Sequence, residues 1–222
     1  MKTRERILLT SLHLFNEEGE PNVTTVDIAN EIDISPGNLY YHFKGKEVIV
    51  EILYNRFDEV FSDILQAPLK QELKIEDSWY YLYVVFEEMY QYRFIYQNVT
   101  DILQRYDTVQ KKFKRLLSLK FQTGYGMVRA LRDAGILEIN DLAIDVLVNN
   151  IVMTVTYWIS YSHLRDGKQP ADLTLHKGVF QVLSLIAPYL AVGKQEYVKL
   201  CESFYRDALQ GNLPVKFHHE EH

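Results

Sequence analysis

The sequence predicts an all-α protein made of a small N-terminal three-helix unit and a larger helical region. Apolar residues recur every three or four positions along most of the 222 residues, which is the spacing of one helix face. Strand signals are nearly absent, because no hairpin dipeptide stands between two segments of alternating polar and apolar residues. Only ten glycines and six prolines are available for irregular structure.

Composition indicates a soluble, cytoplasmic protein. Hydrophobic residues make up 47% of the chain, which is ample for a core, and a single cysteine excludes an internal disulfide framework. The first residues lack the apolar stretch of a signal peptide, and the longest apolar run, which starts at Ile151, is too short to span a bilayer. We therefore expect no membrane partner.

The first 65 residues divide into four expected helices. The first covers about 3–16, and Gly19 follows it as a stop signal. Thr24 or Thr25 caps a short second helix, and Ser35 caps a third whose first residue is Pro36, where a missing N–H costs nothing. A longer helix over 46–65 connects this unit to the rest of the chain.

The stretch SPGNLYYHFKGKE, residues 35–47, concentrates groups that suit phosphate. The whole chain carries a net charge of −6, and residues 1–50 hold five lysines and arginines against eight acids, so bulk charge does not indicate nucleic-acid binding. Between Ser35 and Lys46, however, there is no acid. Two short helices joined by a turn form a helix-turn-helix, whose second helix enters a DNA groove N-terminus first.

The segment VTTVDIANEIDISPGNLYYHFKGKEVIVEIL, residues 23–53, resembles the DNA-binding segment of the TetR/AcrR family of bacterial regulators. The likeness covers about residues 3–53. It implies a homodimer that binds double-stranded operator DNA through residues 1–50 and is released by a small effector bound in a helical domain over 66–222. Asp33 departs from the glycine often found in the turn, and Asn38 departs from the usual threonine or alanine, so base preference does not transfer.

The resemblance also assigns the DNA-contacting residues. The second helix contributes one phosphate contact at its start, the third helix contributes the groove-facing residues, and the connecting helix contributes one backbone contact. These residues are Thr25, Ser35, Pro36, Gly37, Asn38, Tyr40, Tyr41, His42 and Lys46.

The remaining chain predicts long helices over about 76–97, 98–106, 108–134, 141–164, 172–190 and 194–210, with a joint at 66–73. Aromatic residues on three of these helices indicate an apolar cavity with hydroxyls at its rim, although each could equally belong to the core. The effector candidates are Trp79, Tyr83, Phe86, Tyr90, Phe121, Tyr125, Met153 and Tyr157. Two glycines in GYG, 124–126, indicate a kink, a helix break or the close approach of a ligand or helix.

The 141–164 and 172–190 helices are apolar over much of their circumference, and a helix with two apolar faces needs two partners. We therefore expect a homodimer through residues 141–190, and the 141–164 helix has two stripes that could serve. One stripe runs from Ile144 through Val155 to Trp158, and the other contains Val146, Met153 and Tyr157. One belongs to the core and the other to a second subunit, and the pattern leaves open which is which.

An effector-released repressor is the leading interpretation. An activator, or a regulator without an effector, stays open. A helical carrier or enzyme with a vestigial DNA-binding domain is the alternative from another class, but no catalytic arrangement occurs at recognisable spacing. We expect no cofactor, and we interpret HHEEH, 218–222, as a loose end rather than a metal site.

Overall fold

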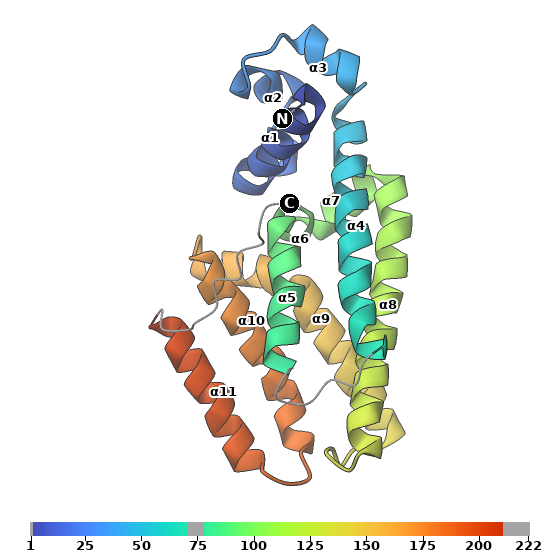
Figure 1. Cartoon of the computed structure of the whole chain (residues 1–222), viewed down its shortest axis with the longest axis vertical. Coiled ribbons are helices and arrows are strands. Elements are labelled where there is room, and N and C mark those ends of the chain that lie inside the picture. The colour runs from blue at the N-terminus through green and yellow to red at the C-terminus, as the bar shows by residue number, and fades with distance from the viewer. Residues whose placement is uncertain (1, 71–77, 211–222) are drawn as a thin grey trace.

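The computed structural model describes residues 2–70 and 78–210. Within them the protein is helical, and the only pairing of extended backbone is an isolated antiparallel bridge between Leu137 and Leu190. Figure 1 shows two lobes, with α1, α2 and α3 at one end of an elongated molecule and the remaining helices bundled below them. The predicted all-α fold is confirmed.

The N-terminal lobe consists of α1 (Thr3–Glu18), a 3-10 turn η1 (Glu20–Asn22), α2 (Thr25–Glu31) and α3 (Pro36–His42). Thr24 is the cap of α2 and forms a capping box with Asp27, while the Ser35 hydroxyl accepts a hydrogen bond from the Asn38 amide at 3.2 Å. Both predicted caps are thus confirmed, with Thr24 rather than Thr25 at the first. One apolar cluster holds the three helices and the start of α4 together; it includes Ile7, Leu8, Phe15, Ile28, Leu39, Phe43 and Ile49.

The turn between α2 and α3 depends on one unusual residue. Asp33 has a φ of 54°, the left-handed conformation that a glycine adopts without strain and an aspartate adopts more readily than most residues. Its amide donates to Asn30 O at 3.2 Å, and the amide of Ile34 donates to Ala29 O at 3.0 Å. The departure from glycine at this position therefore leaves the helix-turn-helix geometry intact.

Helix α4 (Lys46–Lys70) is the long connection between the lobes. It continues past the predicted end at residue 65, so the expected joint at 66–73 is wrong over 66–70, and 71–77 lie outside the described residues. Leu65 explains the extension, because its side chain is buried and its carbonyl oxygen accepts a bond from Thr123 Oγ1 at 2.9 Å. Pro68, two residues before the last residue of α4, lacks the N–H that would bond to Ile64 O.

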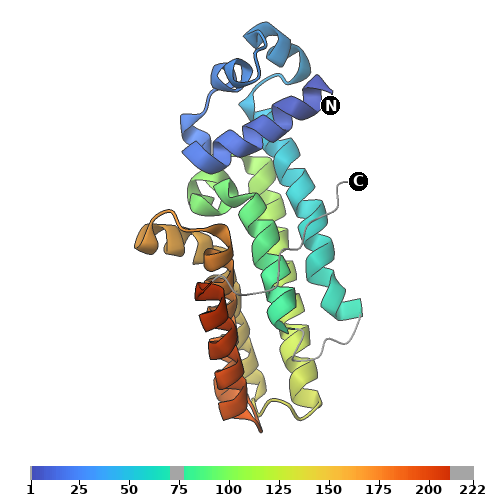
Figure 2. The ribbon, with the colours of Figure 1, turned by 60° about the vertical axis from the view of Figure 1, so that its left-hand side comes forward.

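The C-terminal lobe contains seven further α-helices in its described part. They are α5 (Ser78–Gln91), α6 (Arg93–Gln97), α7 (Val99–Arg105), α8 (Asp107–Asp133), α9 (Asp141–Asp166), α10 (Ala171–Ile186) and α11 (Lys194–Leu209). Helix α8 packs between α4 and α9, and α10 packs against α5, α9 and α11 (Figures 1 and 2).

Two predicted helices end differently in the structure. The 76–97 helix breaks at Tyr92, whose φ of −113° and ψ of 37° are not helical, so α6 is a separate five-residue helix. The 172–190 helix ends at Ile186 and passes into a 3-10 turn, η3 (Ala187–Tyr189), that contains Pro188. By contrast, α8 runs unbroken through Gly124, where a Cβ would lie 3.2 Å from Val148 Cγ1 on α9. Gly124 therefore allows α9 to approach α8 closely and does not break the helix.

Helix α9 is, within the described residues, the one helix long and apolar enough to cross a membrane by length and composition, with a mean hydropathy of 1.5 over its best window. The sequence prediction that no run is long enough considered only uninterrupted apolar residues. In the structure α9 packs against α6, α8 and α10, as the core helix of a helical bundle does.

Candidate nucleic-acid interface and effector cavity

Helix α3 presents a polar face to solvent while two side chains fix it from behind. Leu39 and Phe43 are each 1% exposed and pack into the N-terminal core. On the opposite side, Asn38 is exposed, Tyr40 is 57% exposed and Tyr41 is 75% exposed. Exposed tyrosines on an anchored helix offer hydroxyl groups to an external partner in a fixed orientation.

The N-terminus of α3 is open to close approach. Pro36, Gly37 and Asn38 are all exposed, and a Cβ placed on Gly37 would meet only Ser35 Oγ, at 3.9 Å. Nothing inside the described protein therefore requires a glycine here. The missing side chain instead leaves the backbone accessible to a surface that enters from outside.

The other predicted contacts lie around α3. Thr25 is half-buried at the first position of α2, and His42 is half-buried with its ring edge-on to Tyr41, 5.3 Å between centroids. Lys44, which sequence reasoning did not select, is exposed and places its Nζ 4.8 Å from the centre of the Tyr40 ring. It makes no ion pair with the described residues, so its charge lies free beside the exposed face of α3.

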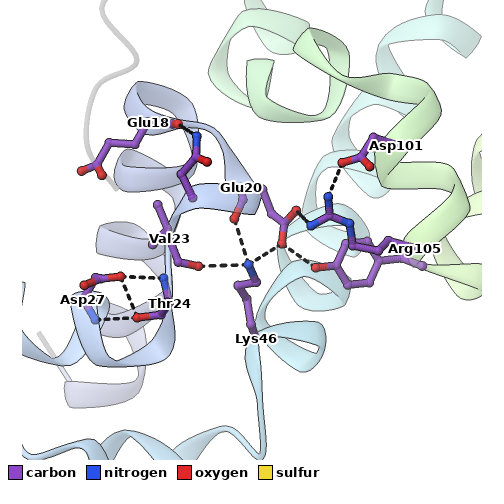
Figure 3. A network of polar contacts seen from close by, with 10 residues as sticks. Glu18, Glu20, Val23, Thr24, Asp27, Lys46, Asp101 and Arg105 are labelled. Carbon is purple, nitrogen blue, oxygen red and sulfur yellow. Dashed lines mark hydrogen bonds and ion pairs between the residues drawn. The ribbon is translucent and has the colours of Figure 1, made fainter.

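Lys46 does not have the predicted place on this face. Its Nζ donates to Glu20 O at 2.9 Å and Val23 O at 3.0 Å, and it forms an ion pair with Glu20 Oε1 at 2.8 Å (Figure 3). An ammonium group has three donors, and all three are used inside the protein. The prediction that Lys46 contacts the DNA backbone is therefore withdrawn, because this side chain closes the start of α4 onto η1.

Glu20 joins the N-terminal lobe to the C-terminal lobe. Its side chain is fully buried, and besides Lys46 it accepts hydrogen bonds from Arg105 at 3.0 Å and from the Tyr106 hydroxyl at 2.6 Å (Figure 3). Burial, followed by the hydrogen bond to Glu20, raises the pKa of Tyr106, so the phenol stays a donor. Because Arg105 ends α7 and Tyr106 precedes α8, one carboxylate binds three segments.

A second contact joins α1 to α6. The buried Asn16 side chain donates to Gln91 O at 2.8 Å and accepts from the Phe94 amide at 3.0 Å. Beside it, the rings of Phe15 and Phe94 lie 5.5 Å apart. Hydrogen bonds therefore hold the N-terminal lobe at Glu20 and at Asn16, and ion pairs from Arg93 and Lys168 to Glu17 add a third connection.

The C-terminal lobe contains a cavity of about 780 Å³, its opening included, between α4, α5, α8, α9, α10 and α11. Its wall is almost wholly apolar, as the walls of small-molecule sites usually are. The lining residues on α5 are Ser78, Tyr81, Leu82 and Val85; those on α8 are Lys120, Thr123, Gly124, Met127, Val128 and Leu131; those on the other helices are Leu65, Ile151, Val152, Val155, Val182, Ile186 and Tyr197.

None of the eight predicted effector residues lines this cavity. Trp79 and Tyr83 pack on His176 of α10, and Phe86 lies against Gly178. Tyr90 lies under Arg93, beside a polar cleft between α1 and α9.

Phe121 and Tyr125 stack on one another and join a separate apolar cluster on α8 and α9, while Met153 and Tyr157 are exposed. The predicted residues lie on three of the helices that line the cavity, α5, α8 and α9, but on other faces of them.

Lys120 is the lining residue that sequence reasoning missed. It is 5% exposed, and among the described residues its Nζ donates only to Thr156 Oγ1, at 3.3 Å. The same Nζ lies 5.3 Å from the ring centre of Phe61 and 5.0 Å from that of Tyr96. Burial lowers its pKa to about 7.

The two stripes of α9 have different environments. Ile144, Val155 and Trp158 are buried within the lobe, and Trp158 Nε1 donates to Thr174 O at 2.8 Å. The other stripe faces outward at helical spacing, with the exposed polar residue Asn150 between Val146 and Met153. Its exposed apolar members are Leu142, Val146, Met153, Tyr157, Tyr161 and Leu164.

Metal-binding groups are not gathered anywhere in the described part of the chain: it contains no cluster of three or more histidine, cysteine, aspartate or glutamate residues that could hold an ion. The HHEEH segment, 218–222, lies outside the described residues.

Comparison with known proteins connects both lobes to bacterial regulators. A family model described as "Bacterial regulatory proteins, tetR family" matches residues 7–53, and one described as "Bacterial transcriptional repressor" of TetR type matches residues 56–198. A TetR-family transcriptional regulator from Marinobacter aquaeolei VT8, solved by crystallography, is 30% identical with a TM-score of 0.83. The alignment covers 92% of this chain and 99% of that one.

Curated relatives are similar to part of this chain. The probable HTH-type regulator YttP of Bacillus subtilis is 28% identical over 107 residues, 45% of this chain and 52% of YttP. The biofilm operon negative regulator IcaR of Staphylococcus aureus (strain Newman) is 28% identical over 104 residues, 46% of this chain and 49% of IcaR. The chain thus spans about half the length of these two relatives.

Proposed function

This chain belongs to the TetR family of bacterial transcriptional regulators, and from that premise we propose that it is a cytoplasmic, homodimeric repressor released from operator DNA by a small, largely apolar effector. The observation that carries the proposal is the exposed face of α3, in which Gly37, Asn38, Tyr40 and Tyr41 face solvent on a helix fixed by buried Leu39 and Phe43. A helix held this way suits the major groove, where phosphate contacts orient a protein and base contacts give specificity.

We assign different roles to the residues of this face. Tyr40 and Tyr41 donate their hydroxyls to phosphate oxygens, and Lys44 supplies the positive charge that had been assigned to Lys46. Asn38, at the third position of α3, reads a base edge, since an asparagine side chain pairs with two atoms of adenine in the major groove. Ser35, Pro36 and Gly37 allow the helix N-terminus to approach closely.

The outward stripe of α9 is the surface we assign to the dimer. A soluble monomer rarely exposes an apolar row of this kind, and a second copy of the same row would cover it with closed symmetry. The two α3 helices would then lie about 34 Å apart, or a larger multiple of one DNA turn. Operator half-sites should show the same spacing.

Release follows from a shift between two arrangements of the lobes. An effector in the cavity contacts α4, the helix that carries the DNA-binding lobe. An effector that prefers the arrangement in which the two α3 helices no longer match successive grooves lowers operator affinity, and DNA lowers effector affinity by the same factor.

Selection of bound fragments from random DNA tests the DNA-binding role. We expect a palindromic site, and Asn38→Ala should relax preference at one position per half-site by about 1–3 kcal/mol. Asn98→Ala, which changes an exposed asparagine outside the N-terminal lobe, is the control and should keep the wild-type site. Enrichment of no sequence by the wild type would refute the proposal and favour a ligand carrier with an inactive N-terminal lobe.

Sedimentation tests the dimer. Met153→Asp and Tyr157→Asp each place a charge in the outward stripe and should produce folded monomers, whereas Gln122→Asp on an exposed part of α8 should stay dimeric. Dimers that persist in both stripe variants would exclude this surface as the interface.

A further inference from the structure

We propose that the effector of this cavity is an apolar monocarboxylate, whose carboxylate binds Lys120 while its apolar body fills the space between α5, α8, α9 and α10. This inference rests on the proposed function, since it names the chemical class of ligand for the same cavity. The argument begins with the placement of one cation.

Lys120 is a cation that the protein itself does not neutralise. Of its three ammonium donors, one reaches the Thr156 hydroxyl, and the rest of its surroundings are the rings of Phe61 and Tyr96. Removing an ammonium from water without a counter-charge is costly, and a methionine would fill a similar volume without that cost. An anion that binds beside Lys120 would supply the missing counter-charge and stabilise the ammonium form over the neutral amine.

The protein supplies no ion-pair partner to Lys120 among the described residues. Asp58, on α4, pairs with Arg115 through Oδ2, and the titratable side chain in contact with the Lys120 ammonium is the buried phenol of Tyr96, whose pKa burial raises. Burial is also the only cause that lowers the pKa of Lys120, and no charge of the protein offsets it. The counter-charge is thus left for a ligand.

The composition of the described lining restricts the ligand further. It includes one cation, Lys120, and no acid. The Lys120 ammonium lies against Thr156, Phe61 and Tyr96, which do not line the cavity, so the ammonium must turn toward a ligand that binds there.

The Thr123 hydroxyl is already used by Leu65 O, while the Tyr81 and Tyr197 hydroxyls are buried and have no hydrogen-bond partner among the described residues. One positive charge and two available hydroxyls in an otherwise apolar wall match a molecule with a single anionic end, and a second anionic group of a dianion would find no cation there.

Lys120 also lies at the end of the cavity that faces the DNA-binding lobe. It is the first lining residue of α8, which begins beside α7 near that lobe and runs away from it (Figure 1). Its neighbour Tyr96 belongs to α6, and Phe94 of the same short helix binds Asn16 of α1. A carboxylate that draws the ammonium away from Tyr96 would therefore act on the helix that holds α1.

Binding to the full-length protein without DNA tests the inference. Decanoate and 2-naphthoate represent a straight-chain and a flat acid, and decanamide and 2-naphthamide are their uncharged counterparts. At pH 6 at least one acid should bind about tenfold or more tightly than its amide, as a charge-assisted hydrogen bond predicts. Above the pKa of about 7 that Lys120 has in the free protein, acid affinity should fall about tenfold per pH unit, because the ammonium form binds, while amide affinity stays constant.

Lys120→Met should abolish both the preference for the acid and its pH dependence, with amide affinity unchanged. Lys114→Met, on an exposed part of the same helix, is the matched control and should behave like the wild type. A circular-dichroism melt of each variant establishes that it is folded.

Failure of both acids to bind the wild type, equal binding of acid and amide, or an unchanged preference in Lys120→Met would each overturn the inference. None of these outcomes affects the DNA-binding role, because no DNA is present. Conversely, Lys120-dependent acid binding that leaves operator affinity unchanged would refute effector release and leave the ligand class standing.

Discussion

Replacing Glu20 with glutamine should weaken the contact between the two lobes and lower the stability of the protein without changing the fold of either lobe. The substitution keeps the size of the side chain and removes its charge. In the wild type, the buried carboxylate accepts from Lys46 at 2.8 Å, Arg105 at 3.0 Å and Tyr106 at 2.6 Å. Glutamine has one acceptor oxygen and an NH2 group, so at least one donor would face another donor.

The magnitude follows from the burial of the partners. Removing one member of a buried ion pair costs about 3–5 kcal/mol, and the lower end applies here because the side chains of Lys46 and Arg105 are 20% and 40% exposed and keep some water. For a chain of this size, about 3 kcal/mol lowers Tm by roughly 6–12 °C. Glu18→Gln, an exposed neighbour at the end of α1, should change Tm by less than about 2 °C.

Thermal unfolding followed by circular dichroism at one fixed protein concentration measures the difference. The concentration must be the same because the stability of a dimer depends on it. A Tm for Glu20→Gln within about 2 °C of that of Glu18→Gln would refute the reasoning, since it would mean that the three donors find equal partners without the charge.

Two further predictions concern the groove-facing lobe and the packing of α9 on α10. Lys44→Ala should lower operator affinity and reduce the slope of log affinity against log salt by about one per protomer, without lowering Tm. Lys46→Ala should instead lower Tm, because it removes three internal contacts. An unchanged salt slope in Lys44→Ala would contradict the phosphate contact. Gly178→Ala should lower the free energy of unfolding by about 1–3 kcal/mol, because a Cβ there would lie 2.7 Å from Trp158 and 2.9 Å from Phe86, while Gly37→Ala, with 3.9 Å of space, should not lower it; denaturant titration compares the two.

The helix-turn-helix was predictable because its signals are local. Thr24 and Ser35 cap their helices through atoms only three residues away, and Pro36 follows the second cap directly. Lys46 was misjudged for the opposite reason. Its partners are backbone oxygens 26 and 23 residues earlier, which only the folded chain brings to it.

The cavity could not be assigned from periodicity because α5 is apolar on more than one face. Tyr83 and Phe86 pack against α10, whereas Tyr81 and Val85 line the cavity. Two adjacent faces of one helix therefore carry the same residue types but contact different surroundings. Lys120 is the last residue of the stretch KKFKRLLSLK, 111–120, which has the composition of a solvated helix face. Its burial depends on contacts with α4, α6 and α9, which are distant in the sequence and cannot be predicted from the residues around Lys120.

The shared position of α6 suggests why modest forces suffice for the proposed release. This helix has only five residues, Arg93–Gln97, and is bounded by the non-helical residues Tyr92 and Asn98. Tyr96 contacts the Lys120 ammonium on the cavity side, and the Phe94 amide binds Asn16 on the DNA-binding side. Coupling between two sites is usually about 1–3 kcal/mol, which one or two weakened hydrogen bonds at Asn16 would supply. We therefore expect release to require a small shift of α6 rather than separation of the lobes. The contacts of Glu20 with Lys46, Arg105 and Tyr106 should stay formed during this shift.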